Sequence, residues 1–110
     1  MNISIGKLAR AFGLSRSTLL YYDSIGLLKP SGRSESRYRQ YSEEDKNRLE
    51  QICTYRQMGV SLEEIKQLLE MPESRAEAIL EEHLVRLSAQ IRLLRKQQQA
   101  IVQRTTRPLI

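Results

Sequence analysis

Two short stretches of helical periodicity begin the pattern of hydrophobic and polar positions along the chain. The first predicts a helix over residues 5–12, which Ser4 can cap and which Gly13 can end in a left-handed conformation. The second predicts a helix that begins after Ser15 and ends at Gly26. The two apolar faces consist of Ile5, Leu8, Ala9, Phe12, Leu19, Tyr22 and Ile25. Two helices joined by so tight a turn indicate a helix-turn-helix, with an ordinary helical hairpin as the alternative.

The pattern changes from helical to alternating between residues 27 and 41. Pro30 and Gly32 lie among serines and mark a turn, and the segment that follows suits a short strand. We predict a small β-hairpin, or wing. One face of its second strand would carry Arg37, Arg39 and Tyr41, and the other would carry Tyr38 and Gln40. A wing of this composition can follow a phosphate backbone.

Two further capped helices follow the predicted wing. Ser42 with Asp45 resembles a capping box, although Asp reaches back less well than Glu or Gln, and Ser61 with Glu64 matches better. Pro72 prevents the second of these helices from continuing far. Their apolar positions are Leu49, Ile52, Cys53, Leu62, Ile65, Leu68 and Leu69. We interpret this helix pair as structural.

The strongest periodic signal lies in the last third of the chain. No Gly or Pro interrupts residues 73–107, and the steps between apolar positions alternate between four and three, as in a coiled-coil a/d seam. The seam consists of Leu80, Leu84, Leu87, Ile91, Leu94, Gln98 and Ile101. Roughly thirty residues at ~1.5 Å each give a helix roughly 45 Å long. Such a helix is too long to bury its seam against the rest of the chain, so a second chain is the expected partner. Gln98 either sets the register of the coiled coil or only lowers its stability. The periodicity does not show whether the two helices run parallel or antiparallel.

These elements predict a mainly α fold in three segments. Residues 1–72 form a winged helix-turn-helix with a small β-hairpin wing and a second helix pair. Residues 73–107 form a long C-terminal coiled-coil helix, and residues 108–110 form a tail.

Charge is unevenly distributed along this chain of 110 residues, whose net charge is +5. Residues 1–41 contain seven basic and two acidic residues, residues 42–73 contain four and eight, and residues 74–110 contain seven and three. A basic first third favours a polyanionic partner, because phosphates attract Lys and Arg and binding releases condensed counterions. A solvated basic face is the alternative.

Composition argues against catalysis and against metal binding. Aromatic residues make up 5% of the chain, which leaves little material for a buried pocket, and no carboxylate pair, His-based triad or phosphate loop is present. One cysteine, Cys53, and one histidine, His83, cannot form an internal disulfide or a tetrahedral zinc site. No run approaches the ~18 apolar residues of a membrane-spanning helix. We expect a cytoplasmic, non-enzymatic protein without a cofactor, a metal or a membrane partner.

The order and spacing of several segments closely resemble the MerR family of bacterial transcription regulators. These segments are Ile5-Gly6-Lys7-Leu8-Ala9, Tyr21-Tyr22-Asp23 with Gly26-Leu27-Leu28, Tyr38-Arg39 with Tyr41-Ser42-Glu43-Glu44-Asp45, and Gly59-Val60-Ser61-Leu62-Glu63-Glu64-Ile65. The resemblance implies a second helix in the major groove, a wing on the flanking backbone, and a homodimer held by an antiparallel coil of the last helix. The chain is similar to the N-terminal part of drug-sensing members.

The resemblance also implies which residues bind DNA and which form the dimer. The candidate DNA contacts are Ser15, Arg16, Ser17, Thr18, Tyr21, Arg37, Tyr38 and Arg39. The candidate dimer contacts are Leu80, Leu84, Leu87, Ile91, Leu94 and Ile101. Arg16 is the best candidate for direct readout, because arginine can bind guanine through two hydrogen bonds. The alternative role of Ser15 is that of a helix cap only.

The chain departs from the family pattern at two positions. Many relatives have Arg where this chain has Leu20, and Gly where it has Arg37. Such a change can move a phosphate contact from the helix to the wing, so the operator cannot be borrowed from relatives.

The resemblance further implies regulation by DNA distortion. In the family, a dimer bends and untwists a promoter whose recognition elements are too far apart for RNA polymerase, and an effector normally biases this switch. Metal-sensing relatives place cysteines at the start of the coil, whereas this chain has none after Cys53. We therefore expect no metal sensing, and we expect either the DNA-binding part of a longer regulator or a regulator without its own ligand.

Two other functions fit the same sequence. An excisionase-like architectural factor that bends DNA shares the winged fold but usually lacks a long dimerising coil. A coiled-coil adaptor with an incidental basic surface would not bind DNA even at low salt.

Overall fold

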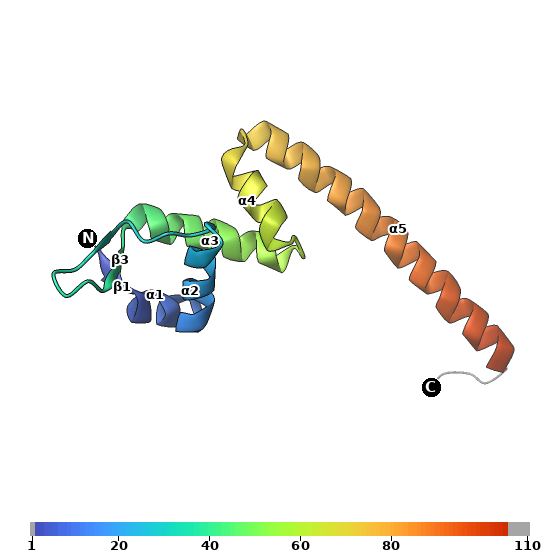
Figure 1. The fold of residues 1–110 in the computed structure, drawn as a ribbon. Coiled ribbons are helices and arrows are strands. Elements are labelled where there is room, and N and C mark those ends of the chain that lie inside the picture. Colours follow the sequence, from blue (N-terminus) through green and yellow to red (C-terminus); the bar gives the residue numbers. More distant parts are fainter. Residues whose placement is uncertain (1, 106–110) are drawn as a thin grey trace. The chain divides into compact units, whose positions relative to one another are not determined.

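The computed structural model describes residues 2–105 and divides into two compact units between Glu70 and Met71. The first unit contains β1 (Ile3–Ser4), α1 (Ile5–Phe12), α2 (Arg16–Ser24), β2 (Gly32–Arg33), β3 (Arg39–Tyr41), α3 (Glu43–Gln57) and α4 (Leu62–Glu70) (Figure 1). The second contains the single continuous helix α5 (Glu73–Thr105). The mainly helical fold with a small sheet confirms the predicted fold class. The expected end of the coil at 106–107 and the tail at 108–110 lie outside the described residues.

Side-chain and glycine caps set the bounds of α1 and α2. The Lys7 N–H donates to the Oγ of Ser4 at 3.3 Å, and the Thr18 N–H donates to the Oγ of Ser15 at 3.0 Å. Gly13 has φ 65°, which brings its N–H back to the carbonyls at the end of α1. The predicted helix over residues 5–12 is confirmed, as are both N-caps. α1 and α2 contact each other. Their buried residues are Ile5, Leu8, Ala9, Leu19 and Tyr22.

The sheet contains one strand that the sequence pattern did not reveal. Its order is β1-β3-β2, with both pairs antiparallel, and Ile3 of β1 pairs with Tyr41 of β3. Two residues are too few to show alternation, so only the pairing with β3 identifies β1 as a strand. Because β1 lies directly before α1, it fastens the wing, formed by β2, β3 and the turn between them, to the helix-turn-helix.

Arg37 does not lie on a strand face. β3 begins at Arg39, and Arg37 has φ 66° in the turn of the wing. The Arg37 N–H donates to the Ser34 carbonyl at 2.8 Å, and the Ser34 N–H donates to the Tyr38 carbonyl, also at 2.8 Å. The prediction that Arg37 shares a face with Arg39 and Tyr41 is therefore wrong, because the closed turn takes Arg37 out of the extended conformation that alternation requires.

Asp45 completes the capping box of α3 despite its short side chain. Its Oδ2 accepts the Ser42 N–H at 2.8 Å, while the Ser42 Oγ accepts the Asp45 N–H at 3.2 Å. The same oxygen accepts the N–H and the hydroxyl of Ser31, at 3.0 and 2.5 Å. One carboxylate thus caps α3 and ties the chain just before β2 to that cap.

The core of the first unit draws on almost every element. Its largest fully buried side chains are Tyr41, Leu8, Leu19, Leu27, Leu28, Leu49, Ile52 and Ile65. Burial raises the pKa of Tyr41 above its ordinary value. Cys53 is half-buried, and burial raises the pKa of its thiol, so it stays protonated and packs as a small hydrophobic residue. Among residues 2–105, no helix combines the length and the hydropathy needed to cross a membrane.

Candidate nucleic-acid interface

The start of α2 presents two side chains without internal partners. Ser15 caps the helix, and its Oγ also lies 2.9 Å from the Oγ1 of Thr18, so both hydroxyls are already engaged. The side chains of Arg16 and Ser17 are exposed and make no hydrogen bond or ion pair with any described residue. Arg16 and Ser17 are therefore the residues of this turn that are free to meet a ligand.

Further along, α2 keeps an exposed side. Tyr21 is 54% exposed and Leu20 is 41% exposed, whereas Tyr22 is buried. Because side chains three and four positions apart lie near each other on a helix, Leu20 and Tyr21 continue the surface that Arg16 and Ser17 begin. We call Arg16, Ser17, Leu20 and Tyr21 the outer face of α2. It combines a cation, two hydroxyls and an apolar side chain.

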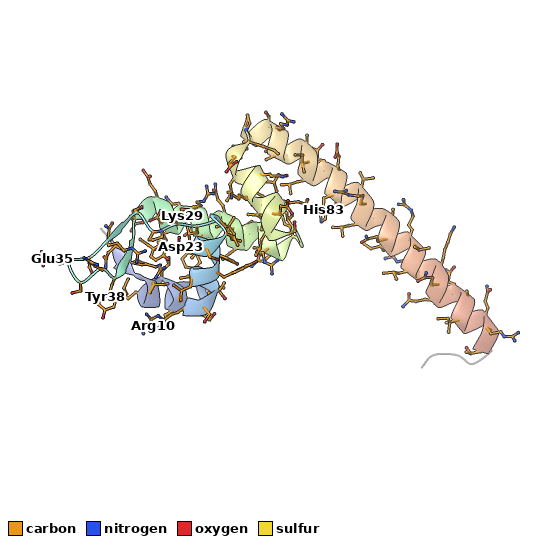
Figure 2. All side chains as sticks on the ribbon, in the orientation of Figure 1. Arg10, Asp23, Lys29, Glu35, Tyr38 and His83 are labelled. Atoms are coloured by element: carbon orange, nitrogen blue, oxygen red, sulfur yellow. The ribbon has the colours of Figure 1, made fainter. Side chains whose placement is uncertain are left out.

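The wing presents a second basic surface. Tyr38 is 68% exposed, and Arg33 and Arg37 are exposed beside it. The Arg33 Nη1 donates to the Arg37 carbonyl at 3.4 Å, and the Tyr38 N–H donates to the Oγ of Ser34 at 3.1 Å. Figure 2 shows Tyr38 on the wing. These contacts order the turn with one guanidinium N–H of Arg33 and without the guanidinium of Arg37.

Asp23 connects the wing to α2. Its Oδ2 accepts the Nε–H of Arg39 at 3.0 Å, and its Oδ1 lies 3.8 Å from the Nζ of Lys29. The Asp23 side chain is only 16% exposed. Sequence reasoning used Asp23 only as part of a motif and gave it no contact. The signal that could have drawn attention to it is that Asp23 is the one acidic residue among residues 1–34.

Two cations from the structural helix pair hold the loop that follows α2. The Nε of Arg48 donates to the Leu27 carbonyl at 2.8 Å, and the Nζ of Lys66 donates to the Ile25 carbonyl at 3.2 Å. Gly26 lies between these carbonyls with φ 74°, and a Cβ there would meet Lys66 Nζ at 3.1 Å. Basic groups at the end of a helix satisfy carbonyls that lack an intrahelical donor. The contacts join residues 21 and 41 positions apart, so no local pattern predicts them.

Replacing Arg37 with glycine is expected to raise the free energy of unfolding. A residue with a Cβ at positive φ is strained by about 1–2 kcal/mol, and glycine loses about 0.5–1 kcal/mol more backbone entropy on folding, which leaves a net gain of up to about 1.5 kcal/mol. Urea denaturation followed by circular dichroism measures this difference. Arg37→Ala is the control, because it removes the same charge and keeps the strain. Equal stability of the two variants would contradict the prediction.

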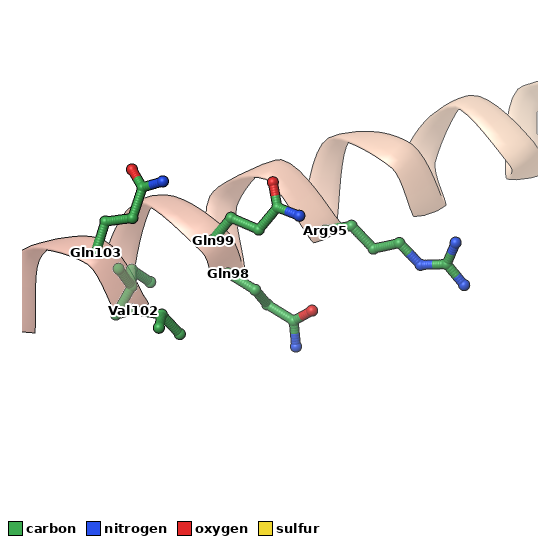
Figure 3. Close-up of a pocket in the computed structure, with 6 residues that line it drawn as sticks. Arg95, Gln98, Gln99, Val102 and Gln103 are labelled. Atoms are coloured by element: carbon green, nitrogen blue, oxygen red, sulfur yellow. The ribbon is translucent and has the colours of Figure 1, made fainter. Parts of the chain in front are cut away.

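On α5, the predicted seam is largely exposed within the single chain. Leu84, Leu87, Ile91, Leu94 and Ile101 are 39–63% exposed, and Leu80 is half-buried. Figure 3 shows an open groove along the C-terminal part of the helix, and it is lined by Arg95, Gln98, Gln99, Ile101, Val102 and Gln103. The groove contains the end of the seam. Large apolar side chains in such a row mark an interaction surface.

Within residues 2–105, no three His, Cys, Asp or Glu side chains lie close enough together to hold a metal ion.

The candidate DNA contacts fall in two groups, at the start of α2 and in the wing. Of the eight, Ser15 and Thr18 are occupied with the cap of α2, Arg39 is held by Asp23, and Arg37 lies in a turn.

Comparison with known proteins assigns the chain to a family. Residues 3–71 match the family described as "MerR HTH family regulatory protein", and residues 47–104 match "MerR, DNA binding". The HTH-type transcriptional activator TipA of Streptomyces coelicolor is 42% identical over 103 residues, which cover 94% of this chain and 41% of TipA. A ZntR homolog of Haemophilus influenzae is 38% identical over 95 residues, which cover 81% of this chain and 70% of the homolog.

The fold also matches a solved crystal structure. The crystal structure of MtaN, the N-terminus of the Bacillus subtilis multidrug transporter activator, superposes with a TM-score of 0.86 at 33% sequence identity, covering 96% of this chain and 99% of MtaN. The chain spans about two fifths of the length of TipA. The sequence matches, the relatives and the fold agree, and the chain belongs to the MerR family of helix-turn-helix transcription regulators.

Proposed function

We propose that this chain regulates transcription as a homodimer that binds an inverted-repeat promoter in double-stranded DNA. The outer face of α2 enters the major groove, and the wing lies on the flanking phosphate backbone. The observation that carries this proposal is the exposed Arg16 and Ser17 at the start of α2, free of internal partners and accompanied by a wing with exposed Arg33, Arg37 and Tyr38. Arginine and hydroxyl side chains in this arrangement suit base edges and phosphates.

The proposal extends to the mechanism of regulation. The dimer distorts its promoter so that RNA polymerase can use it, and this deformation of the duplex costs several kcal/mol that the contacts of the bent form offset. Support comes from membership of the MerR family and from relatives described as transcriptional activators. We further propose that the protein acts in the cytoplasm, with no catalytic activity, cofactor or metal of its own.

In this proposal, residues 1–72 bind DNA and residues 73–107 form the dimer through an antiparallel coiled coil. The charge of α5 supports this direction. Its acidic residues are Glu73, Glu77, Glu81 and Glu82, all near the N-terminal end, and five of its six basic residues are Arg86, Arg92, Arg95, Lys96 and Arg104. An antiparallel pair brings the acidic end of each helix beside the basic part of its partner, whereas a parallel pair places like charges together. The contacts of the coil are the apolar seam residues Leu80, Leu84, Leu87, Ile91, Leu94 and Ile101.

Arg16 and Arg39 are expected to act differently on DNA. Arg16→Ala should relax base preference at one position of the site by about 1–3 kcal/mol, because a bidentate contact to a base edge is lost. Arg39→Ala should weaken binding to all duplexes alike and reduce the dependence on salt, because a phosphate contact carries no sequence information. Titration of single-base variants of the selected duplex measures both effects. Equal losses on every duplex from both changes would refute this division of roles.

The experiment that tests the proposed function selects bound duplexes from a random pool at moderate salt and measures the bend of the selected fragment by gel mobility. An inverted repeat with a central bend is the expected result. Enrichment of bent DNA without a preferred sequence by a monomeric protein would instead support an architectural factor. A well-folded dimer that shifts no duplex even at low salt would support a coiled-coil adaptor.

A further inference from the structure

Asp23 occupies an unfavourable place for a DNA-binding protein. It lies in the last turn of α2, two residues after Tyr21 of the outer face, and it is the only acidic residue among the first 34. A carboxylate so close to a phosphate backbone repels it, so its presence needs a compensating role. The structure offers one, since the carboxylate is mostly buried and engaged with Arg39.

The contact with Arg39 fixes the direction of the guanidinium. Arg39 begins β3, the central strand of the sheet, and donates its Nε–H to Asp23 at 3.0 Å. Among the described residues its two terminal nitrogens have no hydrogen-bond partner. The partnership therefore uses one donor of the planar group and leaves the others available. The second contact of Asp23, to the exposed Lys29 at 3.8 Å, is long and contributes little.

We propose that Asp23 is a positioning residue for DNA binding, which holds Arg39 against the end of α2 so that the wing and the outer face of α2 meet one duplex in a fixed geometry. This inference rests on the proposed function. It assigns to a negatively charged residue a contribution to the binding of a polyanion. The contribution acts through Arg39, because the carboxylate itself does not touch phosphate or base.

Charge and geometry predict opposite effects when Asp23 is removed. If Asp23 acted only as a charge, Asp23→Ala would strengthen binding to every duplex, because the basic surface would become more positive. If Asp23 positions Arg39, the same change weakens binding to the selected duplex, since a freed side chain must be ordered again on binding. Binding to random duplexes, which demands no fixed geometry, should stay equal or become tighter.

Glu35 provides a matched control. It is the next acidic residue along the chain, it lies at the exposed tip of the wing (Figure 2), and it has no hydrogen bond or ion pair with any described residue. Glu35→Ala removes one negative charge from the same basic segment without releasing Arg39. It should therefore strengthen binding to selected and random duplexes alike.

The test compares the wild-type chain with Asp23→Ala, Asp23→Asn and Glu35→Ala by titrating the selected duplex and a random duplex at several salt concentrations. We expect Asp23→Ala to lose about tenfold in affinity for the selected duplex, which is typical of a lost hydrogen bond to a charged group. Asp23→Asn should recover part of the loss, because its amide oxygen can still accept from Nε. In an Arg39→Ala background, Asp23→Ala should cause no further loss.

Thermal melting and the ¹⁵Nε–¹H signal of Arg39 provide readouts without DNA. The Nε–H should exchange slowly with water in the wild type and rapidly in Asp23→Ala while the protein remains folded; if Asp23→Ala unfolds, the comparison uses Asp23→Asn. The inference is overturned if Asp23→Ala tightens binding to both duplexes as Glu35→Ala does, or if its loss persists in the Arg39→Ala background. A wild-type chain without sequence preference would instead overturn the proposed function, and this inference with it.

Discussion

Replacing Ile91 with lysine is expected to convert the proposed dimer into monomers and to abolish tight binding to the proposed inverted repeat. Ile91 lies in the middle of the seam of α5 and is half exposed in the single chain, so its burial depends on the partner. Each chain would lose the burial of one isoleucine, about 1.5–3 kcal/mol, and would place a charge in an apolar seam. Two copies raise the free energy of the dimer by at least about 4 kcal/mol, or roughly a thousandfold in dissociation constant.

Sedimentation equilibrium at low micromolar protein measures this change directly. Ala89→Lys is the control, because Ala89 is exposed two positions earlier and therefore lies on the opposite side of the helix. It should leave the dimer intact. The DNA titration should follow the sedimentation result, since a monomer can bind only half of an inverted repeat. An Ile91→Lys protein that stays dimeric would mean that the seam is not the dimer interface.

Replacing Leu19 with alanine is expected to bring the first unit close to unfolding. Leu19 is fully buried on α2, and truncation of a buried leucine costs about 2–5 kcal/mol because a cavity remains. A unit of about 70 residues has a typical stability of about 4–10 kcal/mol, so this one change removes a large part of it. A cavity beneath α2 also weakens the packing that holds the outer face of this helix in place.

The neighbouring Leu20 supplies the control for this experiment. Leu20→Ala removes the same atoms from the same helix, but Leu20 lies on the outer face, so the change should stay within about 0.5 kcal/mol. Urea denaturation at one fixed protein concentration compares the two variants, because the stability of a dimer depends on concentration. Similar midpoints for both variants would contradict the burial of Leu19 and the orientation of α2.

Local signals determined most of what could be predicted about the fold. Ser4, Ser15 and Gly13 set the ends of α1 and α2 through contacts within a few residues, and such contacts can be seen in the sequence. The capping box of Ser42 and Asp45 formed even though its aspartate is short. In each of these features the interacting groups lie only a few positions apart, so a local sequence pattern is enough to predict the contact.

The remaining features required contacts between distant residues. β1 is a strand only because it pairs with β3, and Asp23 matters because the fold brings it to Arg39, 16 positions away. The alternation of polar residues suggested an extended Arg37, but two backbone hydrogen bonds to Ser34 and from it close a turn there. The candidate site was therefore predicted as a set of residues, while the contact that links its two parts was not.

The contacts of Arg48 and Lys66 determine how small a fragment with the proposed DNA-binding surface can be. The basic surface ends at Tyr41, and charge alone would suggest that residues 1–41 form a separable module. Such a fragment would leave the Ile25 and Leu27 carbonyls without these donors and would expose the buried Leu27 and Leu28. The acidic helices α3 and α4 are thus needed to hold the loop after α2, and the minimal fragment extends beyond Lys66.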